Sequence, residues 1–214
     1  MRFYRVNGND YPSVTTVLQI IHKPGLAKWR EHLGTKEANQ IAREAADIGK
    51  EIHKHCEVVN GLFKKGNLSQ VRSYPVSLIS MPQIKSYTSW LLDNVEEVVG
   101  FEKTIISKKF GYAGTTDLLC RFYGDTALTV GDIKTSNNVW PDMGLQLAAY
   151  AQALKEDGYD VERGVIIHIN KENGNIKVHE FALKPCFSAF LSALYLFRHF
   201  GWDKKKPESI VTIT

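Results

Sequence analysis

The chain has 214 residues, of which 43% are hydrophobic and 23% are charged, and its formal net charge is +4. These values suit one globular domain with a sizeable core, and the mildly basic balance is compatible with binding to nucleic acid. The three cysteines, Cys56, Cys120 and Cys186, are far apart and form no CxxC pair. We therefore expect buried or free thiols in a reducing compartment, and no iron–sulfur cluster.

Neither a secretory signal nor a membrane span is expected. The N-terminal residues lack the apolar region of a signal peptide. The longest apolar stretch, residues 187–200, contains Ser188, Ser192, Arg198 and His199 and is too short to cross a bilayer. The sequence thus favours a cytoplasmic protein that does not bind membranes.

The N-terminal region is predicted to be a small hairpin followed by helices. Residues 2–6 and Tyr11 flank an Asn7-Gly8 turn, a pair typical of tight hairpins. Ser13 or Thr15 then suits the N-cap of a helix, and phosphate binding at this helix start is the alternative role. Pro24-Gly25 ends that helix, and a second helical segment is expected over 26–33.

A long helix is predicted over residues 35–59. Its buried stripe is expected to consist of Ile41, Ala45, Ile48, Ile52 and Cys56, which recur at three- and four-residue spacing. Gly49 and His53 lie on an adjoining face. Residues 61–75 are polar and rich in Gly, Ser and Lys, which predicts a mobile loop, and Pro82 begins a helix expected to run to about Val99.

The middle of the chain is predicted to form a three-stranded meander. Residues 101–107, 113–122 and 126–134 are rich in Ile, Leu, Val, Thr and Phe. Turn residues lie between them, at 109–111 and at Gly124-Asp125.

Three acids are spaced fifteen apart on these strands: Glu102, Asp117 and Asp132. Turns centred on 109–110 and 124–125 oppose 102 to 117 and 117 to 132, with Cβ atoms about 4.5–5.5 Å apart on one sheet face. Lys134 shares that face, because strand side chains alternate. Opposed carboxylates repel, so a row of them indicates a cation such as Mg²⁺ or Mn²⁺. Alternatively, solvent and nearby lysines neutralise three exposed acids.

After the meander we expect a helix over 142–155, on which Gln146 and Tyr150 are i, i+4 neighbours. Strands are predicted at 165–169 and 176–181. The last helix, over 187–200, is apolar nearly all round and is expected to cover one sheet face. The predicted fold class is α/β (α+β), a mixed sandwich of helices and strands.

Several motifs together resemble the PD-(D/E)XK nuclease superfamily, especially its RecB-like and phage-type exonucleases and those of mitochondrial genome maintenance. They are GTTD at 114–117, DIK at 132–134, QLAAY at 146–150, the G-x-x-x-H setting of Gly49 and His53, and the opening YPSVTTVL at 11–18. The resemblance implies a restriction-endonuclease-like core, in which helices flank a mixed central sheet containing the antiparallel meander. It implies one nuclease domain over 1–214, with an N-terminal hairpin and helical region at 1–80 and the nuclease core at 81–214.

The resemblance also implies roles for individual residues. The implied catalytic residues are Asp117, Asp132 and Lys134. The implied metal ligands are His53, Asp117, Asp132 and the backbone carbonyl of Ile133. Supporting or DNA-binding roles fall to Glu102, Gln146 and Tyr150. The proline of the family name is replaced here by Thr116.

Some of these residues also have ordinary structural interpretations. His53 taken alone would be a satisfied histidine on a helix face, and Glu102 would suit a structural role. Trp140 is expected to stabilise a loop, with base stacking as its alternative role.

The implied function is a Mg²⁺-dependent DNA exonuclease, in which Mn²⁺ substitutes for Mg²⁺, acting in recombination, repair or phage DNA metabolism. Its substrate would be single- or double-stranded DNA with a free end, and its partner a single-strand annealing protein or a polymerase. It would work in the cytoplasm, that of the host if a phage encodes it. The alternatives are a structure-specific endonuclease on the same fold and a non-catalytic DNA-binding recombination module.

Overall fold

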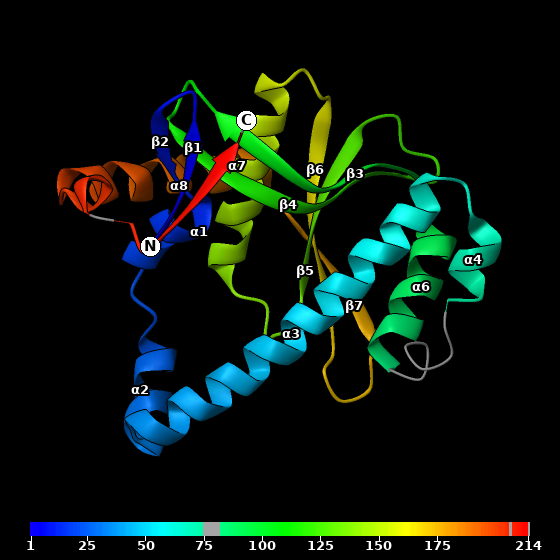
Figure 1. Cartoon of the computed structure of the whole chain (residues 1–214), viewed down its shortest axis with the longest axis horizontal. Coiled ribbons are helices and arrows are strands. Elements are labelled where there is room, and N and C mark those ends of the chain that lie inside the picture. Colours follow the sequence, from blue (N-terminus) through cyan, green and yellow to red (C-terminus); the bar gives the residue numbers. More distant parts are fainter. Residues whose placement is uncertain (75–81, 206, 214) are drawn as a thin grey trace.

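The computed structural model describes residues 1–74, 82–205 and 207–213 and shows a mixed α/β fold with two sheets (Figure 1). The larger sheet has five strands in sequence order: β3 (Val95–Ser107), β4 (Tyr112–Phe122), β5 (Leu128–Lys134), β6 (Val161–Ile169) and β7 (Ile176–Phe181). Within this sheet as described, β5 and β6 are the one parallel pair, and helix α7 (Pro141–Glu156) makes the crossover that a parallel pair requires.

The small sheet joins the two ends of the chain. Strands β1 (Arg2–Val6) and β2 (Asn9–Pro12) form the predicted hairpin, and Asn7 and Gly8 both have positive φ. Strand β8 (Ser209–Ile213) pairs in parallel with β1, a pairing the sequence did not suggest. Ser13 caps the four-residue helix α1 (Val14–Val17), since its Oγ accepts a hydrogen bond from the Thr16 amide at 3.0 Å. A 3₁₀ turn, Leu18–Ile20, follows α1.

The registers of the meander match those predicted from its turns. In the β3–β4 ladder Phe101 opposes Leu118 and Lys103 opposes Thr116, which brings Glu102 level with Asp117. The β4–β5 ladder ends at the Leu118–Gly131 pair, so Asp117 and Asp132 come directly beyond its last pair. The acids are therefore close together at the point where β4 and β5 begin to diverge.

Strand β3 begins earlier than expected, and the prediction of a helix to Val99 was wrong. Helix α6 (Pro82–Asn94) ends before Val95, and the segment from Val95 to Gly100 pairs with β4. The Val-rich sequence VEEVV favours a strand over a helix. Two irregularities in the ladder hide the simple alternation that would have indicated a strand.

Helices cover both faces of the large sheet. On one face α7 packs against the sheet, and α8 (Leu183–His199) lies mainly against α7 as an outer layer. The prediction that the last helix covers the sheet itself was therefore only partly right. On the other face α6 and the second half of α3 (Thr35–Lys64) bury a separate core against the sheet.

The predicted stripe of α3 was wrong in its first half. Ile41 and Ile48 are 41% and 47% exposed, because this half extends beyond the sheet with α2 (Pro24–Leu33) beside it (Figure 1). The residues that α3 buries are Ala38, Ile52, Cys56, Val59, Asn60 and Phe63. The helical spacing of apolar residues therefore identified one face of α3 but did not show whether another element packs against it.

The mobile loop predicted for residues 61–75 was also wrong where the structure describes it. Helix α3 continues to Lys64, and a further helix, α4 (Leu68–Arg72), follows a turn at Gly66. Phe63 and Val71 are buried in the core under α3, which fixes this polar segment. Pro75 lies outside the described residues.

The cysteines and the longest helices bear on two of the predictions made from composition. Cys56, Cys120 and Cys186 are free thiols, and the first two are buried, as predicted. Within the described residues, no helix has the length and apolar character needed to pass through a membrane. A short 3₁₀ turn, Trp202–Lys204, links α8 to β8.

Candidate active site

The predicted site residues meet where the middle of β4 and the end of β5 lie between α3 and α7. Asp117 comes from β4, and Asp132 and Lys134 come from β5. His53 reaches them from α3 on one side, and Gln146 from α7 on the other. Residues from four separate elements thus gather at one place on the sheet.

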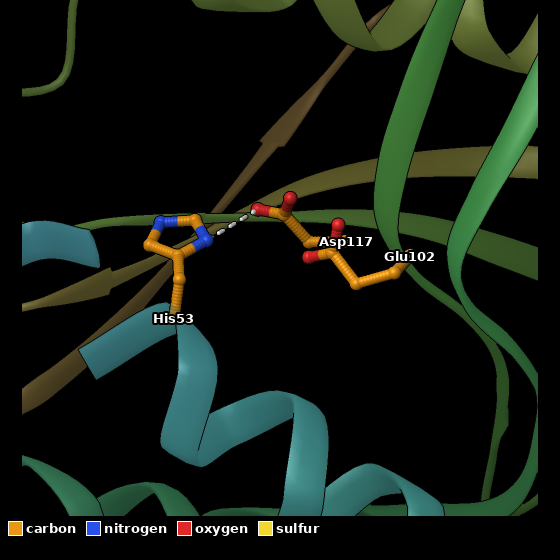
Figure 2. Close-up of side chains that lie close together, drawn as sticks. All are labelled: His53, Glu102 and Asp117. Carbon is orange, nitrogen blue, oxygen red and sulfur yellow. Dashed lines mark ion pairs between the residues drawn. The ribbon is translucent and has the colours of Figure 1, made fainter. Parts of the chain in front are cut away.

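One group of side chains has the arrangement of a cation site. Single ligand atoms of His53, Glu102 and Asp117 all lie within 4.8 Å of one another. Figure 2 shows the His53 ring extending from α3 toward Asp117, with the Glu102 carboxylate beside it. His53 Nδ1 lies 3.5 Å from Asp117 Oδ2. The two carboxylates suit Mg²⁺ or Mn²⁺ and the imidazole suits Zn²⁺ or Fe²⁺, so the donor set fits a divalent cation.

Asp117 is held in place by the backbone of β5. The amide of Ile133 donates a hydrogen bond to Asp117 Oδ2 at 2.7 Å, so Ile133 contacts the site through its N–H. Burial, followed by the nearby charge of Asp132, raises the pKa of the Asp117 carboxyl well above its ordinary value. A bound cation would offset both effects, which is the behaviour expected of a metal ligand.

His53 is suited to binding a cation as a neutral ring. Its pKa is lowered by burial and then by the charge of Lys134. A neutral imidazole keeps one nitrogen lone pair for a ligand. The approach of His53 to the site depends on Gly49, four residues earlier in α3. A Cβ at Gly49 would lie only 3.2 Å from Thr135 Oγ1. The glycine allows α3 to approach the end of β5 closely.

Asp132 lies deeper, in a network with Lys134 and α7. It is 2% exposed, Oδ1 accepts a hydrogen bond from Gln146 Nε2 at 2.7 Å, and Oδ2 forms an ion pair with Lys134 Nζ. Gln146 Nε2 also lies 3.0 Å from the Tyr150 hydroxyl. Burial tends to lower the pKa of Lys134, but the carboxylates of Asp132 and Asp117 together raise it above its usual value. One oxygen of Asp132 is thus hydrogen-bonded, and the other is ion-paired with Lys134 but accepts no hydrogen bond from the described residues.

Glu102 is the unusual member of the group. Its φ of 44° lies in the left-handed region, which residues other than glycine rarely adopt and which typically costs about 1–3 kcal/mol. Partial desolvation and the neighbouring Glu57 raise the pKa of its carboxyl. Such backbone strain concentrates at functional sites. Nothing in the sequence indicated this conformation, because a left-handed glutamate has no local signal.

The structure groups the predicted metal ligands differently from the motifs. His53 and Asp117 lie together with Glu102, which the resemblance placed among the supporting residues, while Asp132 is engaged by Lys134 and Gln146. All eight predicted residues are nevertheless at this one site or contact one another around it. Their assignment to metal binding and catalysis remains a prediction.

The comparisons with known proteins identify no family. No protein-family profile matches the chain, and no curated protein matches it in sequence. Among solved structures it is similar to a protein designated SSO0001, with 14% identity, a TM-score of 0.46, and coverage of 94% of this chain and 76% of that one. It is also similar to a protein of Eubacterium rectale described as a candidate exonuclease, with 11% identity, a TM-score of 0.45, and coverage of 76% and 69%. Likenesses of this degree assign no function.

Proposed function

We propose that the protein is a metal-dependent DNA nuclease of the PD-(D/E)XK type that acts as an exonuclease. The observation that carries this proposal is the convergence of His53, Glu102 and Asp117 beside the Asp132–Lys134 pair. A cation site next to a held ammonium is the combination that phosphodiester hydrolysis requires, because negative charge accumulates on the phosphate in the transition state. The helix–meander–helix–strand order of residues 82–181 supports the same proposal.

His53, Glu102 and Asp117 would hold Mg²⁺ or Mn²⁺. When bound, such an ion polarises the phosphate and lowers the pKa of a coordinated water. The protein's contribution is to fix the ligands: the Ile133 amide orients Asp117, and Gly49 lets α3 bring His53 close. The neutral form of His53 leaves its lone pair available.

Lys134 would act on the phosphate and the attacking water. Its ion pair with Asp132 places the ammonium at the end of the carboxylate row, where a phosphate oxygen of the substrate would come within hydrogen-bonding distance. Stabilising charge that develops in the transition state is the role such a group performs best. Gln146 and Tyr150 orient Asp132 from α7 and so hold Lys134 indirectly.

A gel time course with end-labelled DNA tests this function. Linear and closed circular DNA, each single- and double-stranded, would be incubated with Mg²⁺ or with EDTA. We expect Mg²⁺-dependent loss of linear DNA only. Lys134→Ala should remove this activity, while Lys155→Ala, an exposed residue at the far end of α7, should retain it.

Each other outcome of this experiment points to a different function. Cutting of closed circles would show an endonuclease instead. DNA binding without cleavage by the wild-type protein would show a non-catalytic module. Equal cleavage by wild type and Lys134→Ala would rule out the proposed site.

A further inference from the structure

A cavity of about 530 Å³ is lined by residues from three places: the segment after β5, strand β6 and strand β7. One wall is the segment 137–141, which runs from the end of β5 into α7. The floor is formed by side chains from β6 and β7, among them His168, Lys177 and His179. The position is the carboxyl end of the parallel pair β5–β6, where ligands commonly bind in α/β folds.

The strand registers place this cavity on the same sheet face as the site. Lys134 pairs with His168, and His168 pairs with Lys177, so these three side chains form one row across β5, β6 and β7. Paired residues of adjacent strands point to the same face, and neighbouring strands are about 4.8 Å apart. The backbones of Lys177 and Lys134 are therefore two strand spacings apart, about 10 Å. The cavity continues the row that begins with the catalytic lysine.

The lining carries the positive charge of Lys177 together with several hydrogen-bond donors. Lys177 is exposed, and none of the described residues that line the cavity is acidic. His168 Nε2 donates to the Ser136 carbonyl at 2.6 Å, which fixes the segment that forms the wall. His179 Nε2 is buried and has no hydrogen-bond partner among the described residues. This nitrogen has almost no accessible surface, so the exposed hydrogen-bond donors of the lining are those of Lys177, Asn137 and Asn138.

Trp140 adds an aromatic surface at the rim. It is 50% exposed although it is large and apolar, and it lies directly before the first turn of α7. The amide groups of a helix start favour an anion. Asp142, the acid in that first turn, is paired with Lys23 at 2.6 Å, so its charge is offset. The rim thus combines a flat aromatic ring with a field that attracts phosphate.

We propose that this cavity binds one nucleotide of a DNA single strand, adjacent to the nucleotide whose phosphate lies at Lys134. Lys177 contacts its phosphate, and Trp140 stacks on its base. Stacking requires an unpaired base, so the cavity selects single-stranded over double-stranded DNA close to the cleavage site. This inference extends the proposed nuclease function by naming the strand form that the site accepts.

The test is equilibrium binding of a labelled single-stranded oligothymidylate in EDTA, followed by fluorescence anisotropy. Binding is measured without cleavage, so the result does not depend on catalysis. Trp140→Ala should weaken binding about tenfold or more, as expected for the loss of one stacked base. Lys177→Ala should weaken binding and reduce the dependence of log affinity on log salt by about 0.7, the value for one phosphate contact on a single strand.

Two controls make the result specific. Lys155→Ala removes the same charge near the other end of α7, about 22 Å from Trp140 along the helix, and should bind as wild type does. A blunt duplex of the same length should lose much less affinity in Trp140→Ala than the single strand does. An equal loss with duplex would contradict stacking on an unpaired base.

The proposal is overturned if Trp140→Ala and Lys177→Ala bind the single strand as tightly as Lys155→Ala does, or if wild type does not bind it. Such a result with normal Mg²⁺-dependent cleavage would leave the nuclease function in place. Conversely, weakened binding in both variants of a protein that never cleaves DNA would keep the nucleotide site and reject the nuclease.

Discussion

Gly114 of β4 lies against the ring of Tyr150 from α7 so closely that a Cβ at position 114 would be 2.6 Å from Tyr150 Cε1. Real Cβ atoms do not approach ring carbons to this distance. The Tyr150 hydroxyl is 3.0 Å from Gln146 Nε2, which in turn donates to Asp132 Oδ1. A glycine in the GTTD motif therefore sets the position of the carboxylate that holds Lys134.

The Gly114→Ala variant should lose both stability and activity. Because Tyr150 is 3% exposed and has little room to move, the added methyl group should cost about 1–3 kcal/mol, the range for overpacking a core. Urea unfolding and the rate of DNA cleavage would measure the two effects. Gly25→Ala is the matched control, since a Cβ at Gly25 would meet nothing within 4 Å. Equal behaviour of the two variants would contradict the role of Gly114.

The arrangement of the acids was predictable because it depends on local turn chemistry. Two short turns fix the registers of β3, β4 and β5, and those registers put Glu102, Asp117 and Asp132 together whatever the rest of the fold does. The side-chain roles within the group were less predictable. The depth of Asp132 depends on how α7 packs and where Gln146 then points, which no local pattern specifies.

The incorrect predictions about α3, residues 61–72 and β8 have a common physical cause. The apolar period of α3 is real, but Ile41 and Ile48 are exposed because none of the described elements covers them. Residues 61–72 are polar in composition, yet Phe63 and Val71 fix them to the core. The pairing of β8 with β1 joins the two ends of the chain. In each case the outcome depends on long-range packing, which a local pattern does not contain.

Removing Asp132 should destabilise the fold as well as abolish cleavage. Asp132 is 2% exposed, so Asp132→Ala would leave the Lys134 ammonium without its partner in a mostly enclosed position. Breaking a buried ion pair costs about 3–5 kcal/mol, and the low end applies because the Lys134 side chain is 25% exposed. A double-mutant cycle with Lys134→Met, measured by urea unfolding, should show that the two losses are not additive. Additive losses would mean that the pair contributes nothing to stability.

Lys134→Ala should lower the turnover number much more than it lowers DNA affinity. The ammonium faces charge that develops only in the transition state, so its loss affects the reaction more than binding of the ground state. Single-turnover cleavage with Mg²⁺ and equilibrium binding in EDTA would separate the two effects. If affinity fell as much as turnover, Lys134 would instead be a phosphate clamp.

The metal-free protein should lose stability as the pH rises through the pKa of Asp117. Burial and the charge of Asp132 raise that pKa in the folded state, so the fold favours the protonated carboxyl. Its contribution is complete below the ordinary pKa of about 3.9 and declines as the pH rises toward the folded-state value. Asp117→Asn cannot ionise and should gain stability relative to wild type over this range.

Melting temperatures in EDTA at a series of pH values would measure this trend. Asp10→Asn is the control of opposite sign, because its hydrogen bond from Arg5 lowers the pKa of Asp10. A constant difference between Asp117→Asn and wild type at all pH values would show that Asp117 titrates normally.

Divalent cations should raise the melting temperature of the wild-type protein, because an ion that binds only the folded state stabilises it in proportion to the logarithm of its concentration. His53→Ala and Asp117→Asn each remove one ligand atom from the group of three and should reduce this rise, as should Glu102→Gln.

His55→Ala is a matched control, since His55 lies two residues along α3 and contacts the Tyr74 hydroxyl instead. Differential scanning fluorimetry with Mn²⁺, Mg²⁺ or EDTA would measure these shifts without any DNA. If His53→Ala responded to Mn²⁺ as fully as His55→Ala does, His53 would not be a ligand. A loss in Asp117→Asn but not in Glu102→Gln would place the cation between Asp117 and Asp132, as the sequence motifs alone implied.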